Sequence, residues 1–235
     1  MLPYLKDQLY LPLLEVAVNH FWAVRAGQHA GRKVADTGNR SAVTGGKQLD
    51  GFVTMFRAIA TAVGVPDAWI HDRSTTLPGF FRPSKNWDLI ILSDQRELLA
   101  VLECKSQVGS FGNNFNNRTE EAIGSAVDLW TAFRENSFGE QTAPWLGYLM
   151  VLEDHAGSSR AVRVSEPHFT VREEFADTSY RDRYQLLCKK LVAERHYNAA
   201  CTLMTKNVTT DLPTEASATI HAFVRSFVSN LISRV

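Results

Sequence analysis

The sequence predicts an α/β fold in which a mixed central β-sheet is flanked by helices. Two largely apolar strings of strand length, Asn86–Leu92 and Leu98–Lys105, are joined by a polar stretch of turn length. Stretches with apolar residues at helical spacing lie on both sides of this pair. The order helix, strand, strand, helix, strand is typical of a sheet with helices packed on it.

Two helices are expected before the first strand. Apolar side chains recur at helical spacing in Leu13–Ala30 and again in Gln48–Val63, and Gly64 and Pro66 end the second helix. Residues 31–46 between them are basic, contain glycine and show no periodicity, so we expect a loop there. The two strings that follow are apolar on both faces, which is typical of strands covered on each side.

The elements after the strands are predicted in the same way. We expect a loop at the polar stretch Ser106–Asn117, a helix at Arg118–Asn136 and a third strand at Trp145–Leu152. Further helices are expected at Tyr180–Tyr197 and Glu215–Ser233; core burial explains the apolar stripe of the last one more often than a dimer interface does. The buried stripe of the helix at 118–136 is expected to consist of Ile123, Val127, Trp130 and Phe133.

Length and composition favour one soluble domain. The 235 residues are expected to form a single domain, 1–235, with a core at about residues 47–153 and a C-terminal helical part at about 175–235. No apolar stretch approaches the roughly 18 residues of a membrane span, and the N-terminus lacks a signal-peptide core. The three cysteines, widely spaced and odd in number, indicate reduced thiols in a cytoplasmic protein.

The charge of the chain is balanced overall but unevenly distributed. The formal net charge is zero, which argues against a nonspecific nucleic-acid binder with excess base. Residues 23–48 hold five basic residues against one acid, whereas residues 119–154 hold seven acids against one arginine. One face of the molecule can therefore be basic although the whole is neutral.

Charged residues stand at one end of the predicted strand pair. A turn centred between Gln95 and Arg96 places Asp88 directly opposite Glu103. Because side chains alternate between the faces of a strand, Glu103 and Lys105 point the same way. Two carboxylates and an ammonium group are therefore expected to converge at one end of a buried hairpin.

This set of groups suits metal-assisted phosphodiester hydrolysis. Mg²⁺ prefers oxygen ligands, and Asp88, Glu103 and the main-chain carbonyl of Cys104 are the candidates. Lys105 would orient or help to deprotonate the attacking water and offset charge on the phosphorane. The alternative is an exposed salt-bridge cluster, since a D…ExK match alone arises by chance. The agreement of register, apolar runs and turn favours the catalytic site.

The element order and the D…ExK pattern together resemble the PD-(D/E)xK nuclease superfamily, with its restriction-endonuclease-like core. Longer strings narrow the resemblance to XhoI-type type II restriction endonucleases. These strings lie between about residue 13 and Leu152, which is some two thirds of the chain. Trp87 replaces the proline of the superfamily, and Cys104 faces away from the metal, so neither is expected to alter the chemistry. The strings are His20–Trp22, Val43–Phe52, Asn86–Asp88, Glu103–Gly109, Ser110–Gly124 and Asp128–Trp130.

The resemblance implies a type II restriction enzyme that cuts both strands of a short palindrome in double-stranded DNA with Mg²⁺. For the XhoI group the palindrome is CTCGAG, cut after the first C to leave 5′ TCGA ends. A palindrome read by a protein implies a two-fold symmetric homodimer with one active site per strand. The family also implies a cognate DNA methyltransferase that protects the host DNA.

Further site residues follow from the same resemblance. Many nucleases of the superfamily carry an extra acid on the helix before the first strand, which suggests Asp50, and more weakly Glu15, for metal binding or support. A helix cap is the alternative for Asp50.

The candidate DNA-binding residues are chosen by their chemistry. Amide and guanidinium groups suit base edges, and basic loops hold the DNA backbone, although asparagine also favours turns and caps. The candidate DNA-binding residues are Arg40, Lys47, Gln107, Asn113, Asn114, Asn116, Asn117 and Arg118.

Two other functions compete with the restriction enzyme. A structure-specific or repair nuclease on the same core would show little sequence preference, and the Asn-rich string argues against it. A non-catalytic DNA-binding protein on this fold is the other alternative. The intact set of Asp88, Glu103 and Lys105 argues against that protein, because a degenerate site usually loses a ligand.

Overall fold

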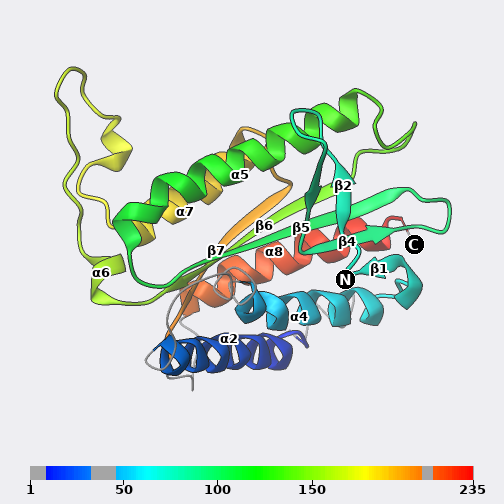
Figure 1. Cartoon of the computed structure of the whole chain (residues 1–235), viewed down its shortest axis with the longest axis horizontal. Coiled ribbons are helices and arrows are strands. Elements are labelled where there is room, and N and C mark those ends of the chain that lie inside the picture. Colours follow the sequence, from blue (N-terminus) through cyan, green and yellow to red (C-terminus); the bar gives the residue numbers. More distant parts are fainter. Residues whose placement is uncertain (1–8, 33–45, 208–213, 235) are drawn as a thin grey trace.

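The computed structural model of the chain describes residues 9–32, 46–207 and 214–234, and confirms the mixed α/β architecture (Figure 1). A five-stranded sheet has the order β1-β4-β5-β6-β7, and β2 and β3 form a separate two-stranded sheet. The strands are β1 Ile70–His71, β2 Thr76–Pro78, β3 Ser84–Asn86, β4 Leu89–Leu92, β5 Leu98–Gln107, β6 Trp145–Glu153 and β7 Ala199–Thr205. The helices are α2 Leu11–Arg32, α4 Asp50–Ala62, α5 Phe111–Arg134, α6 Ala156–Ser159, α7 Tyr180–Ala193 and α8 Thr214–Ile232, with 3₁₀ turns η1 Lys47–Leu49, η2 Asp67–Trp69 and η3 Glu173–Phe175.

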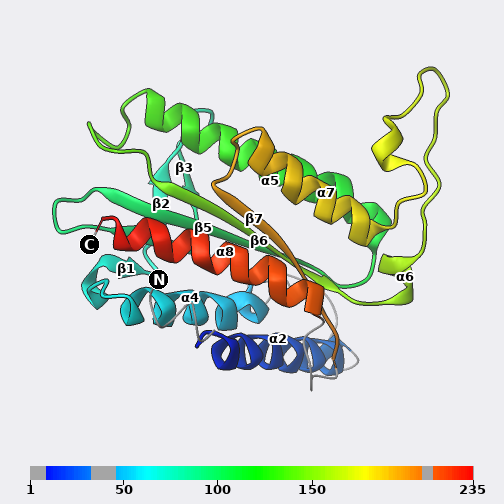
Figure 2. The same ribbon diagram turned by 180° about the vertical axis from the view of Figure 1, so that it is seen from behind.

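Helices cover both faces of the large sheet. Strands β1, β4 and β5 pair antiparallel, whereas β5, β6 and β7 pair parallel, so the sheet is mixed as predicted. Helices α5 and α7 lie on one face, and α2, α4 and α8 lie on the other (Figures 1 and 2). Each face has its own apolar cluster, so the central strands are buried on both sides. In the second layer Phe56 contacts both Phe223 and Phe227 edge to face.

The predicted register of the β4–β5 hairpin is confirmed at the end that carries Asp88, whereas a register shift between Ile91 and Leu92 pairs Leu92 with Leu98 near the turn. Leu89 pairs with Leu102 and Ile90 with Val101, a register that continues to Asp88 opposite Glu103. The turn between the strands is closed by Ser93, whose N–H donates to the Glu97 carbonyl at 2.9 Å. The sequence therefore predicted correctly which residues meet at the end of this hairpin.

The predicted loop at Ser106–Asn117 is wrong. Strand β5 continues to Gln107, and α5 begins at Phe111, so the Asn-rich string forms the first turns of a helix. Asparagine has low helix propensity, which favoured the loop prediction, but burial of the Phe111 side chain fixes the helix start. Gly109 and Ser110 have φ values of 64° and 45°, and this left-handed backbone turns the chain from strand into helix.

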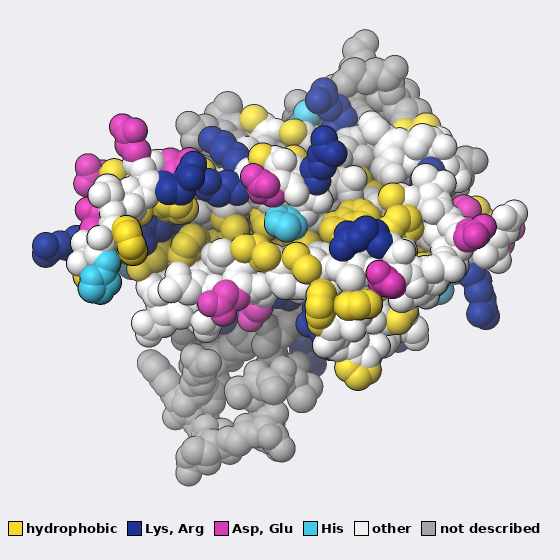
Figure 3. Space-filling view, turned by 90° about the horizontal axis from the view of Figure 1, so that it is seen from above, with side chains coloured by type: hydrophobic (Ala, Val, Ile, Leu, Met, Phe, Trp, Pro, Cys, Tyr) yellow, Lys and Arg dark blue, Asp and Glu magenta, His cyan; other side chains and the backbone are white. Residues whose placement is uncertain are grey.

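The predicted buried stripe of α5 is also wrong, because the helix is rotated from that expectation. Ile123 is 39% exposed, and Val127, Trp130 and Phe133 are only half-buried. The face that meets the sheet consists mainly of small residues, which let the helix approach closely. Viewed onto α5 and α7, hydrophobic side chains form a band across the molecule with Lys and Arg beside it (Figure 3). The residues buried on α5 are Phe111, Ala122, Ser125, Ala126, Asp128, Leu129 and Ala132.

Other elements were missed or refined. The C-terminal part is not purely helical, since β7 pairs with β6 along seven residues of the sheet. The hairpin of β2 and β3 was not predicted either, because its strands are only three residues long and mostly exposed. The apolar stripe of α8 belongs to the core: Ile220, Phe223 and Phe227 are at most 2% exposed.

One expectation from composition is borne out in the described residues. Cys104, Cys188 and Cys201 are free and buried, as expected for reduced thiols. Burial raises the pKa of the Cys188 thiol to about 12, so it stays protonated at neutral pH. Within residues 9–32, 46–207 and 214–234, no helix combines the length and apolar character that crossing a membrane requires.

We predict that Gly147→Ala destabilises the protein by about 1–3 kcal/mol, through overpacking of the core. A Cβ at this position in β6 would lie 2.1 Å from Cη2 of Trp145 and 2.9 Å from Cζ of Phe223. Urea unfolding followed by tryptophan fluorescence measures the change. Gly27→Ala in α2 is the matched control, because a Cβ there meets nothing within 4 Å. An unchanged unfolding midpoint for Gly147→Ala would contradict the described packing of Trp145.

Candidate active site

Asp88 is held in place by the backbone of the neighbouring strand. Its N–H donates to the Leu102 carbonyl at 3.1 Å, which continues the ladder past the end of β4. Its carboxylate Oδ2 accepts a hydrogen bond from the Cys104 N–H at 2.6 Å. The Asp88 side chain thus replaces a main-chain carbonyl opposite Cys104, and its position is fixed by the sheet itself.

Glu103 is the buried centre of the site. Its side chain is 2% exposed, and Oε1 accepts hydrogen bonds from the ammonium groups of Lys85, at 3.0 Å, and Lys105. Its second oxygen, Oε2, is buried and has no partner among the described residues. A buried carboxylate oxygen without a donor is costly, so this atom is available for a ligand.

Lys85 is a site residue that the sequence reasoning missed. It lies on β3, opposite Leu77, and its ammonium group lies 4.5 Å from the ring centroid of Trp87. The strand is short and polar, so no apolar pattern marked it as part of the fold. The one signal in the sequence was its position three residues before Asp88, which keeps it near the site.

Two groups of the site, Asp88 and Lys105, have shifted pKa values. Burial and the neighbouring Glu103 carboxylate raise the pKa of Asp88 to about 6, against the opposing effect of Lys105. Burial alone would lower the pKa of Lys105, but Glu103 and Asp88 outweigh it and raise that pKa above its ordinary value. Lys105 is therefore an ammonium ion at neutral pH, and a cation bound beside Asp88 would favour the ionised form of that carboxyl group.

These groups open into a cleft between the β2–β3 hairpin, β5 and α5. Its volume is about 500 Å³. Its lining contains basic side chains, acidic side chains and one aromatic ring, that of Phe81. The lining residues are Phe81, Arg82, Lys85, Glu103, Lys105, Arg118, Glu120, Glu121, Gly124, Ser125 and Asp128.

The oxygen atoms present fit a hard divalent cation. Asp88 and Glu103 supply two carboxylates, and Glu103 Oε2 is unpartnered. In a β-strand the N–H and C=O of one residue point to the same side, so the Cys104 carbonyl points toward Asp88, as its N–H does. The described residues contain no cluster of three or more His, Cys, Asp or Glu side chains. Two carboxylates with a carbonyl and waters are nevertheless enough for Mg²⁺, which retains several waters.

The other predicted site residues are scattered. Asp50 is exposed in the first turn of α4, on the opposite face of the sheet from α5, and does not line the cleft. An acid in this turn favours the helix dipole, which explains it without a metal. Lys47 is exposed in η1 beside Asp50. Arg40 lies outside the described residues.

The polar residues after β5 divide into internal and exposed groups. Gln107 is buried and donates to the Gly109 carbonyl, and Asn114 donates to the Ser110 carbonyl at 3.0 Å, so both side chains have partners within the fold. Asn113, Asn116 and Asn117 are exposed. Their spacing of three and four residues places them on one face of α5.

Arg118 lies in the cleft on the next turn of α5. Its Nη1 donates to Oε2 of Glu121 at 2.5 Å, and its Nε is buried without a partner among the described residues. A buried guanidinium N–H that lacks an acceptor suits a phosphate oxygen. Arg118 thus lies between the exposed asparagines and the carboxylates.

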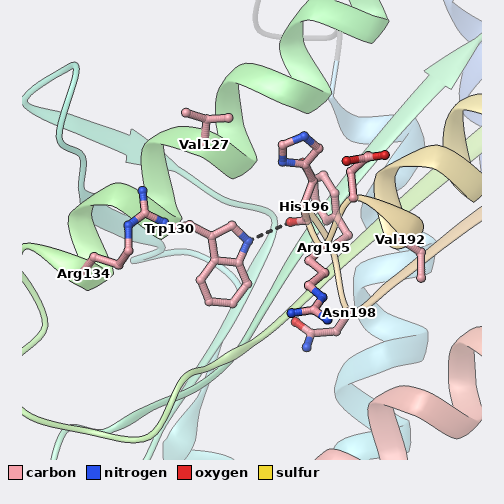
Figure 4. A pocket seen from close by; sticks show the side chains of 9 residues that line it. Val127, Trp130, Arg134, Val192, Arg195, His196 and Asn198 are labelled. Carbon is pink, nitrogen blue, oxygen red and sulfur yellow. Dashed lines mark hydrogen bonds between the residues drawn. The ribbon is translucent and has the colours of Figure 1, made fainter.

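A second cavity, of about 690 Å³, lies between α5 and the turn from α7 to β7 (Figure 4). Trp130 Nε1 donates to the His196 carbonyl at 2.7 Å, and Asn198 Oδ1 accepts from the Leu146 N–H at 2.7 Å. These bonds join the turn to α5 and to β6. Glu194 is the one acid in the lining, so this cavity lacks the paired carboxylates of the cleft.

Asp128 attaches the β2–β3 hairpin to α5. Its side chain is 5% exposed; Oδ1 accepts from the N–H groups of Phe80 and Phe81 at 2.9 and 2.8 Å, and Oδ2 accepts from Arg82 at 2.7 Å. These hydrogen bonds and the ion pair lower the pKa of Asp128, against the effect of burial. Gly79 is required nearby, since a Cβ there would lie 2.6 Å from Asp128 Oδ2.

A mixed sheet with two carboxylates and a lysine at the end of its antiparallel hairpin defines a nuclease of the restriction-endonuclease-like class. The family model described as restriction endonuclease XhoI matches residues 28–216, well beyond the strings recognised in the sequence. The chain belongs to the XhoI family of restriction endonucleases. It is therefore a type II restriction endonuclease, which acts on double-stranded DNA, and enzymes of this class generally use a divalent metal ion.

Curated relatives agree with this family. Type II restriction enzyme BstVI of Geobacillus stearothermophilus is 51% identical over 178 residues, which cover 72% of this chain and 78% of the relative. Type II restriction enzyme XhoI of Xanthomonas vasicola is 45% identical over 188 residues, covering 78% and 75%. Type II restriction enzyme AbrI of Azospirillum brasilense is 53% identical over 126 residues, covering 52% and 56%. No solved structure matches the chain.

We predict that Asp128→Ala releases the tip of the β2–β3 hairpin and destabilises the protein by about 1–3 kcal/mol, the cost of leaving polar groups unpaired. Limited proteolysis with chymotrypsin measures the release, because Phe80 and Phe81 lie at the tip. Asp67→Ala is the control, since Asp67 is 72% exposed in its ion pair with Arg57 and surface pairs contribute little. Equal cleavage rates in both variants would show that Asp128 does not hold the tip.

Proposed function

We propose that this enzyme cuts both strands of the palindrome CTCGAG in a Mg²⁺-dependent reaction that leaves 5′ TCGA ends. The observation that carries the chemistry is the unpartnered, buried Oε2 of Glu103 close to Asp88 and Lys105. The relative named XhoI, 45% identical over 75% of its length, supports the recognition sequence of that group.

In the proposed site, Asp88 and Glu103 hold Mg²⁺ together with the Cys104 carbonyl. A bound divalent cation acidifies water and offsets the negative charge on a phosphate. The sheet prepares the ligands beforehand, since the Cys104 N–H fixes Asp88 Oδ2. Two lysines occupy Glu103 Oε1 and leave Oε2 for the cation. Asp50 gains no support from this geometry, and we assign it no role.

Lys105 has the proposed role of positioning the attacking water and stabilising the phosphorane. Because its pKa is raised, it acts as a cation and a hydrogen-bond donor rather than as a base in the resting enzyme. Lys85 is a positioning residue in this proposal: it holds Glu103 from the hairpin side, at 3.0 Å. The two ammonium groups together hold Oε1 of Glu103 in place within the fold.

The proposed DNA contacts come from α5 and from the basic segment before α4. Asn113, Asn116 and Asn117 share one exposed helix face, which suits base edges in the major groove. Arg118 is assigned to a phosphate near the cleavage site, and Lys47 and Arg40 to the DNA backbone. Gln107 and Asn114 are assigned structural roles, because each side-chain amide donates to a main-chain carbonyl within the fold.

A palindromic site further suggests a homodimer with one active site per DNA strand. A cognate methyltransferase that modifies the same site completes the proposal, because a cell must protect its own DNA from this activity.

We predict that Lys105→Ala lowers the cleavage rate by roughly 10²–10³-fold, the usual cost of removing one transition-state donor. DNA affinity, measured by fluorescence anisotropy, should stay nearly unchanged. Lys189→Ala is the matched control, as Lys189 is exposed on α7. A Lys105→Ala protein that cuts at the normal rate would contradict the assigned role.

A second variant tests the metal ligand. A Glu103→Gln protein with full Mg²⁺-dependent activity would contradict the metal-ligand assignment.

A plasmid digest tests the whole proposal. With one CTCGAG site present, we expect a single double-strand cut in Mg²⁺ and none in EDTA, and sequencing of the ends should show 5′ TCGA. Discrete cuts at another sequence would agree with a restriction enzyme but would contradict CTCGAG as its recognition sequence. Nicking or smearing would favour a structure-specific nuclease, and DNA that stays intact in Mg²⁺ would contradict catalysis by this chain.

A further inference from the structure

The tip of the β2–β3 hairpin presents two adjacent aromatic rings to solvent. Phe80 is 50% exposed and Phe81 is 68% exposed. Their ring centroids are 4.9 Å apart in an edge-to-face arrangement. Among the described residues the one other exposed phenylalanine is Phe169, which stands alone. Exposing two neighbouring rings is unfavourable in water, so the pair calls for a partner.

The tip is rigid, although it is exposed. The N–H groups of both phenylalanines donate to the buried Asp128, and the Gly79 N–H donates to the Pro83 carbonyl at 3.3 Å. Arg82, in the same loop, forms an ion pair with Oδ2 of Asp128. A loop fixed by its backbone while its side chains project outward presents those side chains in one orientation.

The tip is also part of the catalytic cleft. Phe81 and Arg82 line the same cavity as Glu103 and Lys105, and Lys85 of the same hairpin bonds to Glu103. Any DNA whose scissile phosphate reaches the carboxylates therefore passes the two rings. Arg82 and Lys85 flank the rings, each in an ion pair with a buried carboxylate, so the surroundings of the rings are polar.

We propose that Phe80 and Phe81 form an apolar wedge that inserts beside the scissile phosphate and partly unstacks the adjacent bases. Phenylalanine serves DNA-binding proteins in this way, and stacking on an aromatic ring compensates for the lost base stacking. The inference rests on the proposed function, because it takes the carboxylate cleft as the place of cleavage. The wedge would help to place the phosphate and would favour sites whose base step at the cut unstacks readily.

The test uses a fluorescent base in the DNA. The adenine that pairs with the thymine next to the cut is replaced by 2-aminopurine, whose emission rises when it leaves the stack. The protein carries Glu103→Gln so that the duplex stays intact. We expect emission to rise on binding, and Phe81→Ala and Phe80→Ala to abolish the rise and weaken affinity by roughly tenfold to a hundredfold.

Three comparisons separate the wedge from a structural effect. Phe81→Trp should restore the emission, since another aromatic ring can stack. Phe169→Ala, which removes an exposed ring outside the cleft lining, should change nothing. The unfolding midpoint should be the same in all variants, as the substituted rings are largely exposed.

Other results would overturn the proposal. Unchanged emission and affinity in the variants with Phe80→Ala or Phe81→Ala would exclude the wedge. A change in sedimentation of the free protein, with DNA affinity intact, would assign the rings to contact with a second copy of the chain. A Glu103→Gln protein that still cuts would contradict the proposed catalytic site instead, so the two failures are distinguishable.

Discussion

The burial of the Glu103 carboxylate is the constraint on which the site depends. A charge at 2% exposure is strongly unfavourable unless other groups compensate it. Two lysines supply that compensation, and they reach Glu103 from different parts of the chain: Lys105 from the same strand and Lys85 from a separate hairpin. The hairpin must therefore pack against the sheet, and Asp128 fixes it there through α5. One buried carboxylate thus determines where β5, α5 and the hairpin meet.

The centre of the fold could be predicted from the sequence because its signals are local. The lengths of two apolar strings and the turn between them were enough to place Asp88 opposite Glu103, and alternation placed Lys105 with them. These relations span fewer than twenty residues. Backbone pairing enforces them directly, so tertiary packing had little opportunity to override the pattern.

The predictions that were wrong, and the elements that were missed, concern parts of the fold whose structure depends on long-range packing. The Asn-rich string has poor helix propensity, yet it is helical because Phe111 is anchored in the core. Helix α5 turns small residues such as Ala122 and Ala126 to the sheet, so the largest apolar side chains did not mark its buried face. Strand β7 gains its role only from a neighbour far away in sequence, and Lys85 lies on a three-residue strand that has no apolar pattern. No local periodicity carries that information, which is why these parts required the three-dimensional structure.

The parallel half of the sheet has a further consequence for how the protein forms during synthesis. The paired carboxylates and the lysine are complete once the ribosome has passed residue 105, but β6 gains its outer neighbour only with residues 199–205. The apolar cover from Phe223, Phe227 and Leu231 comes later still. Contacts between residues so distant in the chain form slowly, and a nascent chain that bears only the β4–β5 hairpin has no closed core around it. The layer that supports the β4–β5 hairpin is therefore complete only when α8 is present, and we expect a chain that lacks α8 to leave one face of these strands uncovered.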